Sequence, residues 1–148
     1  MKYFFLLLTI CSLTTYAQTD DEAAKVPILQ FFEGMRQSDS NMIKASLAPN
    51  AILQTISKNK EGKTIVRSDD VAKFITSVTQ PHEAVYDERI TFGSIKIDAD
   101  LATVWTPYQF YVGDKFSHCG VNSFQLVKLD GAWKIQYIID TRRKQGCL

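Results

Sequence analysis

The chain has 148 residues, with 17 lysines and arginines against 16 aspartates and glutamates. That length suits one ordinary domain with a real hydrophobic core. The near balance of charge gives no support for binding nucleic acid or an anionic membrane surface, so neither is expected as a partner.

The N-terminus has the pattern of a secretion signal. Lys2 is followed by a mostly apolar stretch over residues 3–13, and Thr15-Tyr16-Ala17 places small residues where a signal peptidase cleaves. The apolar stretch is too short for a stable membrane span, although an uncleaved tether is an alternative. We therefore predict a signal peptide over residues 1–17, a single mature domain over 18–148, and export to the periplasm or the medium.

Residues 21–37 are predicted to form a first helix, because Ile28, Phe31, Phe32 and Met35 recur at helical spacing. Pro27 suits a first helical turn, which suggests that the regular helix begins near Val26. A short second helix is expected over residues 41–47.

A hairpin follows, with strands over residues 51–57 and 63–67. A third helix is expected to start at Ser68 or Asp69, which can cap it. Its apolar positions 71, 74, 75 and 78 fall on one helical face. The rest reads as strands: 85–92, 94–99, and three more between Leu101 and Arg143.

Tight turns at Gly113-Asp114 and Asp130-Gly131 join those last three strands, which must then be antiparallel. Helices that come early in the chain have to cover one face of such a sheet. The predicted class is α+β.

Alternation along these strands divides their side chains between two faces. If both turns have two residues, the face that packs on the helices is predicted to carry Leu101, Thr103, Trp105, Gln109, His118, Asn122, Phe124, Leu126, Trp133, Ile135, Tyr137 and Ile139. Tyr108, Cys119 and Asp140 fall on the other face. A bulge near Thr106-Pro107, Gly120 or Ile138 would change this register and could bring Asp140 beside His118.

The first face becomes polar toward one end, where a closed core would not need histidine and asparagine side chains. We therefore expect a pocket there. Its predicted ligand-binding residues are Phe32, Trp105, Tyr108, Asn122 and Tyr137.

The element order and the final strands resemble the nuclear transport factor 2-like superfamily, especially small exported bacterial members labelled SnoaL-like or lumazine-binding-like. The resemblance covers the mature chain, and its most specific part is the segment WTPYQFYVGDKFSHCGVNSFQLVKLDGAWKIQYIIDTRR. It implies a cystatin-like α+β roll: a cone-shaped, strongly curved antiparallel sheet wrapped around three N-terminal helices. Relatives in this superfamily include isomerases, dehydratases, epoxide hydrolases and polyketide cyclases, and others only bind ligands or dimerise. The chain lacks the Asp-Arg-Asp set of the epoxide hydrolases and the full His/Asp/Tyr set of the dehydratases.

His118 and Asp140 are the candidate catalytic residues, as a general base and its partner. The alternatives are a histidine bonded to a backbone carbonyl or to Asn122, and an aspartate paired with Arg142 or Arg143. Three functions stay open: binding of a small apolar or aromatic molecule, a cofactor-free isomerase, dehydratase or cyclase, and a module that forms a homodimer through the sheet.

Two cysteines remain after removal of Cys11 with the signal. Cys119 and Cys147 could pair in an oxidising compartment or stay as free thiols. The sequence has no CxxC, HExxH or clustered His/Cys pattern, so neither a metal nor a cofactor is expected.

Overall fold

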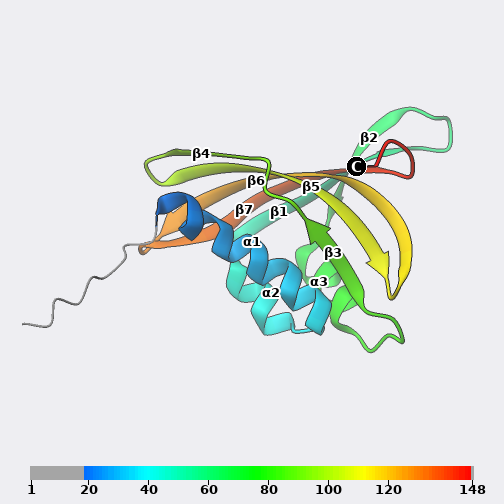
Figure 1. Ribbon diagram of the computed structural model, residues 1–148, viewed down its shortest axis with the longest axis horizontal. Coiled ribbons are helices and arrows are strands. Elements are labelled where there is room, and N and C mark those ends of the chain that lie inside the picture. The colour runs from blue at the N-terminus through cyan, green and yellow to red at the C-terminus, as the bar shows by residue number, and fades with distance from the viewer. Residues whose placement is uncertain (1–18, 148) are drawn as a thin grey trace, which may run out of the picture.

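The computed structural model describes residues 19–147, so the predicted signal peptide and Cys11 lie outside the described residues. Three helices lie against one face of a curved sheet (Figure 1). The helices are α1 (Asp20–Gln37), α2 (Ser40–Ser46) and α3 (Val71–Thr79). The strands are β1 (Leu47–Lys58), β2 (Thr64–Asp69), β3 (Tyr86–Ile90), β4 (Ser94–Asp98), β5 (Leu101–Val112), β6 (Lys115–Leu129) and β7 (Ala132–Arg143). Among these residues, no helix is long and apolar enough to cross a membrane.

Helix α1 begins where its sequence provides a cap. The Thr19 side chain accepts a hydrogen bond from the Glu22 N–H at 3.4 Å, and acidic residues occupy the positive first turn. Pro27 is buried inside the helix. The prediction of a regular helix starting near Val26 is therefore wrong, because capping and packing of the apolar face outweigh the one backbone hydrogen bond that Pro27 cannot make.

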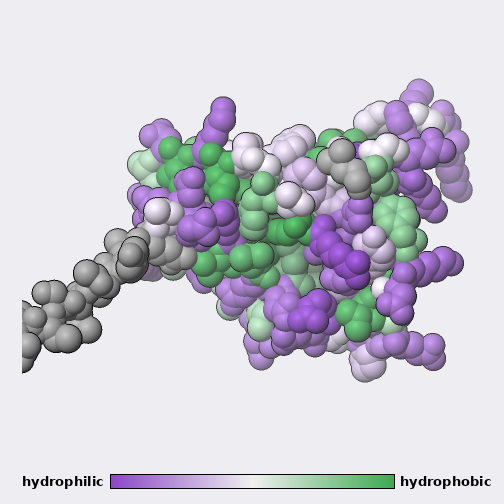
Figure 2. Space-filling view, viewed as in Figure 1, coloured by the Kyte–Doolittle hydropathy of each residue, from purple (hydrophilic) through white to green (hydrophobic). Residues whose placement is uncertain are grey.

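Helix α3 is capped by Asp70, whose side chain accepts from the Lys73 N–H at 2.8 Å. Ser68 and Asp69, the predicted caps, instead belong to β2 and pair with β1. The β1–β2 hairpin projects from the body (Figure 1), and its turn is strongly hydrophilic (Figure 2).

The sheet has the order β2-β1-β7-β6-β5-β3, and β4 also pairs with β5. Every pair is antiparallel except β1 with β7, which run parallel. The α+β prediction is confirmed. The parallel pair was not predicted, because it joins strands from opposite ends of the chain.

Both predicted two-residue turns are present: Val112 faces Lys115, and Leu129 faces Ala132. The register beyond them differs from the prediction at two points. In the β5–β6 ladder Tyr111 faces Phe116 but Phe110 faces His118, so Ser117 is an extra residue on β6. This bulge shifts β5 by one position relative to the predicted register.

The second irregularity lies in the β6–β7 ladder. Leu126 faces Ile135 and Gln125 faces Tyr137, which leaves Gln136 as the extra residue on β7. Beyond this bulge every β7 side chain lies on the face opposite to the predicted one.

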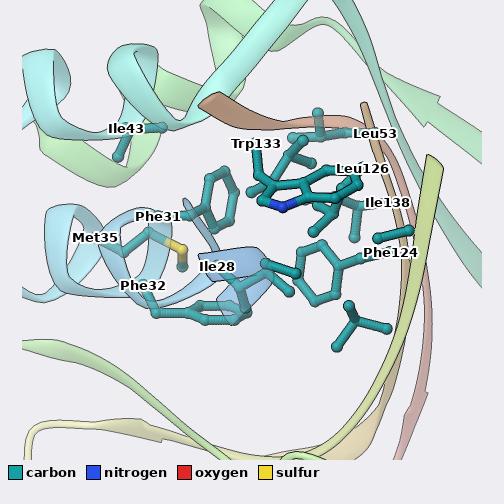
Figure 3. Close-up of a cluster of buried hydrophobic side chains, with 14 of the residues drawn as sticks. Ile28, Phe31, Phe32, Met35, Ile43, Leu53, Phe124, Leu126, Trp133 and Ile138 are labelled. Atoms are coloured by element: carbon teal, nitrogen blue, oxygen red, sulfur yellow. The ribbon is translucent and has the colours of Figure 1, made fainter. Parts of the chain in front are cut away.

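The hydrophobic core fills the space between α1 and the sheet. The side chains of Phe31, Phe32 and Met35 point from α1 toward Phe124 and Ile138 on the strands (Figure 3). The rings of Phe32 and Phe124 meet edge to face, with centroids 6.0 Å apart. The core therefore occupies most of the cone.

A disulfide joins Cys119 to Cys147. It ties the C-terminal tail to β6, and the Cα atoms are 5.8 Å apart. Such a bond is consistent with an oxidising, extracytoplasmic compartment.

Candidate functional site

A row of four polar residues crosses the inner face of the sheet. Thr106 on β5 faces Asn122 on β6, Asn122 faces Asp140 on β7, and Asp140 faces Thr55 on β1. All four are buried, with exposed fractions between 0% and 7%. Buried polar groups are costly unless they are hydrogen-bonded, so this row is where the inner face departs from a simple core.

Two side chains from outside the row complete its hydrogen bonds. The amide nitrogen of Asn122 donates to a carboxylate oxygen of Glu88, on β3, at 2.8 Å. On the other side, Asp140 Oδ2 accepts from Arg142 Nε at 2.9 Å, and Arg142 also donates to Thr55 at 3.3 Å. Two carboxylates therefore flank Asn122.

Tyr108 closes the row toward the rim of the sheet. Its single hydroxyl hydrogen is shared between two acceptors, a carboxylate oxygen of Asp140 at 3.2 Å and the carbonyl oxygen of Thr141 at 2.9 Å. The ring crosses Gly120, where a Cβ atom would lie 2.7 Å from the ring and 1.8 Å from the Thr141 carbonyl oxygen. Only glycine fits at position 120 with Tyr108 in this position.

A small cavity of about 80 Å³ opens between this polar row and the helices. Asn122, Asp140 and Glu88 form its polar floor, and Asp69 and Arg142 also line it. Its apolar wall comes from α1, α3, β1 and β7 and consists of Phe31, Phe32, Met35, Leu53, Phe74 and Ile138. The cavity thus combines a hydrocarbon wall with a few convergent polar groups, as small-molecule sites usually do.

A wider hollow of about 320 Å³ lies beside the disulfide. Arg89, Pro107, Gln109, Cys119 and Arg143 contribute to its lining. These side chains come from positions that alternate with the inward-facing ones, so the hollow opens mainly on the outer face of the sheet, although Ile90, Tyr108 and Gly120 also border it.

The electrostatics of the floor are dominated by carboxylates. The pKa of Glu88 is raised to about 7, chiefly by burial and also by the nearby Asp140, while the hydrogen bond from Asn122 opposes the rise. Burial and the same two acids, Glu88 and Asp140, also raise the pKa of Tyr108 far above its usual range, so its hydroxyl stays protonated. Glu88 is therefore the group at this site that titrates near neutral pH.

The structure brings three of the predicted site residues, Phe32, Asn122 and Asp140, to the cavity. Tyr108 faces inward too and reaches the row through its hydroxyl. The predicted register placed Tyr108 and Asp140 on the other face, and the bulges at Ser117 and Gln136 make that register wrong. The alternative of a bulge near Ile138 that turns Asp140 inward agrees with the bulge at Gln136.

The same bulges put two predicted residues on the outer face. Trp105 pairs with Ser123 rather than facing Asn122, and 48% of its side chain is exposed. Tyr137 donates its hydroxyl hydrogen to Gln54 at 2.6 Å, next to Ile138, which faces inward. The predicted common face for Trp105, Tyr137 and Asn122 is wrong, and neither aromatic residue lines the cavity.

His118 faces inward but does not reach the cavity. Its Nδ1 atom is 3.0 Å from the Ser117 hydroxyl, and its ring lies edge-on to Tyr108 with centroids 5.7 Å apart. Burial, reinforced by Arg142, lowers the pKa of His118. Within residues 19–147 no hydrogen bond joins His118 to Asp140, which is paired with Arg142 as one of the alternatives expected. A catalytic role for the two stays a prediction.

Glu88 lines the cavity and was not among the residues predicted from the sequence. A signal was present in the sequence. Tyr86, Glu88 and Ile90 occupy every second position of β3 and so share its inward face, where Glu88 is the one charged residue. A charged residue at such a position indicates a polar pocket. Among the described residues, no group of three or more His, Cys, Asp or Glu side chains is placed to hold a metal ion.

No family model matches this sequence, and no curated protein matches it. Solved structures do match. A conserved protein from Planctomyces limnophilus aligns with a TM-score of 0.68 and 14% identity, over 84% of this chain and 96% of that one. An NTF2-like protein of unknown function from Shewanella baltica gives a TM-score of 0.64 and 15% identity, over 89% and 99% of the two chains.

A domain of unknown function with a cystatin-like fold, from Nostoc punctiforme, gives a TM-score of 0.65 and 15% identity, over 88% of this chain and 82% of that one. At these identities the likeness shows the fold. The chain has the NTF2-like, cystatin-like fold that the resemblance of its final strands implied.

Proposed function

We propose that this chain, with its NTF2-like fold, is an exported protein that binds a small, largely apolar or aromatic molecule in its cone. The cavity carries this proposal, because six apolar side chains face a floor of hydrogen-bonding groups in one opening. Export is supported by the signal-like N-terminus and by the disulfide between Cys119 and Cys147.

The cavity limits the ligand. About 80 Å³ accommodates a polar head group and the first part of a hydrocarbon body, and a larger body would extend through the opening. Met35 lies in the wall and is the side chain best able to adjust, since its unbranched chain repacks easily.

A matched pair of aromatic substitutions tests this proposal. Phe74→Leu removes a ring from the wall while keeping an apolar side chain, and Trp105→Leu removes an exposed ring from the outer face. In an NMR titration with benzyl alcohol, we expect Phe74→Leu to weaken binding several-fold and Trp105→Leu to leave it unchanged. Equal effects of the two substitutions would contradict binding in the cone.

Native mass spectrometry of the protein purified from the exporting cell would identify the natural ligand. A bound small molecule that is lost in the Phe74→Leu variant would support the proposal. Recovery of ligand-free protein alone would count against it.

A cofactor-free enzyme of the isomerase, dehydratase or cyclase kind is the second candidate. The observation in its favour is Glu88, whose pKa of about 7 suits a general acid or base inside an apolar-walled cavity. In this version Glu88, rather than the predicted pair of His118 and Asp140, would transfer the proton. Turnover with a bell-shaped pH profile that Glu88→Gln abolishes would establish it.

A homodimer through the outer face of the sheet remains a separate prediction. Two of the exposed hydrophobic side chains on that face, Ile52 and Trp105, are each 48% exposed. Light scattering coupled to size-exclusion chromatography would decide it, and a monomer at high concentration would rule it out.

A further inference from the structure

We propose that the cone selects ligands that carry a protonated amino group, which Glu88 and Asp140 would receive on either side of Asn122. This inference rests on the proposed function, since it names the chemical class of the molecule that the cavity binds.

The arrangement of the ion pair makes the floor negative. Asp140 is 10% exposed, whereas its partner Arg142 is 47% exposed. The carboxylate is therefore the more buried member of the pair, whereas the guanidinium, which also lines the cavity and donates to Thr55, is about half open to solvent. Asp140 pairs with Asn122 across the β6–β7 ladder, and the side-chain amide of Asn122 donates a hydrogen bond to Glu88.

Glu88 is partly buried and has no cationic partner among the described residues. Its hydrogen bond comes from the neutral amide of Asn122, and within the described residues 19–147 no lysine, arginine or histidine forms a salt bridge with it. A buried charge without a partner is costly, so this carboxylate gains more from a cationic ligand than from a neutral one.

The groups around Glu88 strengthen the preference. Tyr108 on β5 and Asp140 and Arg142 on β7 interact electrostatically with Glu88, and Asp69 at the end of β2 lines the same cavity. Helix α1 contributes only apolar side chains to the cavity wall. The surroundings thus contain two further carboxylates and one guanidinium, which already bonds to Asp140.

The wall suits the rest of such a molecule. The rings of Phe31 and Phe74 stack with centroids 5.7 Å apart, and Phe32 lies edge-on to Phe31 at 5.4 Å. Figure 3 shows Phe31 and Phe32 projecting from α1 toward the sheet. Aromatic faces attract cations as well as hydrocarbon, so an amine on a short apolar or aromatic body meets aromatic rings and carboxylates in the same opening.

Three probes that differ only in their polar group test the inference: benzylamine, benzyl alcohol and benzoate. Each would be titrated by NMR or calorimetry into the oxidised protein at pH 6.0 and pH 8.5. We expect benzylamine to bind most tightly and benzoate most weakly. The affinity for benzylamine should rise about tenfold from pH 6.0 to pH 8.5, as Glu88 becomes ionised.

Glu88→Gln should weaken the binding of benzylamine at least tenfold and remove the pH dependence of that binding. It should leave the affinity for benzyl alcohol nearly unchanged. Glu83→Gln, at an exposed position, is the matched control and should change nothing. If Glu88→Gln does not fold, the pH dependence of the unmodified protein still decides the matter. The amine preference predicts that benzylamine binds more tightly at pH 8.5 than at pH 6.0, whereas a site that makes no use of the Glu88 charge predicts equal benzylamine affinity at the two pH values.

The outcomes separate the two proposals. Binding of benzyl alcohol as tight as that of benzylamine, together with weakening by Phe74→Leu, would overturn the amine preference and leave the proposed function standing. If benzylamine bound equally well to Glu88→Gln, the inference would also fail. Absence of binding by all three probes would count against both.

Discussion

Replacing Glu88 by glutamine should change how the stability of the protein depends on pH. The pKa of Glu88 is about 7 in the folded protein, against a usual value of 4.5. The folded state therefore holds this proton more tightly than the unfolded state does. The protonated carboxyl of Glu88 makes its full contribution to the free energy of unfolding below pH 4.5, and this contribution is lost as pH rises through about 7.

Each unit between the folded and unfolded pKa values is worth about 1.4 kcal/mol, so ionisation of Glu88 costs the folded state about 3 kcal/mol in total. Some of this is already lost at pH 5, which leaves about 2–3 kcal/mol between pH 5 and pH 8.5. Glu88→Gln cannot ionise. It should remove this loss and be more stable than the unmodified protein at pH 8.5.

Urea unfolding at 25 °C across this pH range would measure the effect, followed by fluorescence of the buried Trp133. The quantity to compare is the difference in free energy of unfolding between the two proteins at each pH. The lowered pKa of His118 makes both proteins more stable as pH rises, and this effect cancels in the difference. Glu83→Gln serves as the control for a neutralised exposed acid. Parallel stability curves for Glu88→Gln and the unmodified protein would refute the reasoning.

Two further substitutions test the close packing of Tyr108 against Gly120. Gly120→Ala should lower the free energy of unfolding by about 3–4 kcal/mol, because a methyl group there collides with Tyr108 and with the facing carbonyl. Gly62→Ala, in an open turn with φ of 78°, should cost only about 1 kcal/mol, and similar losses for the two would contradict this account. Reduction of the bond between Cys119 and Cys147, which are 28 residues apart, should cost about 3–4 kcal/mol in urea unfolding. An unchanged midpoint with dithiothreitol would show that the tail contributes no stability.

Local patterns in the sequence predicted most of the elements. The apolar spacing of α1 and α3 identified both helices, and the Gly113-Asp114 and Asp130-Gly131 turns gave the final hairpins. Those signals lie within a few residues of the structure that they specify. The parallel pairing of β1 with β7 has no such signal, because it depends on how the whole sheet closes.

The candidate site was harder to predict because it depends on two bulges. Nothing about Ser117 or Gln136 marks either as an extra residue in its strand, yet each reverses the faces of the residues beyond it. Trp105 consequently lies outside the cone, and Asp140 lies inside it. Phe32 and Asn122 were predicted and do line the cavity, and Glu88, which was missed, was within reach through the alternation of its strand.

The parallel contact between β1 and β7 also has a consequence for the timing of folding. The centre of the sheet includes a strand that is complete only when Arg143 has been made, long after Lys58 finishes β1. At ordinary rates of translation that delay is roughly 4–17 s. During this time α1 and α2 have no finished sheet to pack on, so the nascent chain stays open.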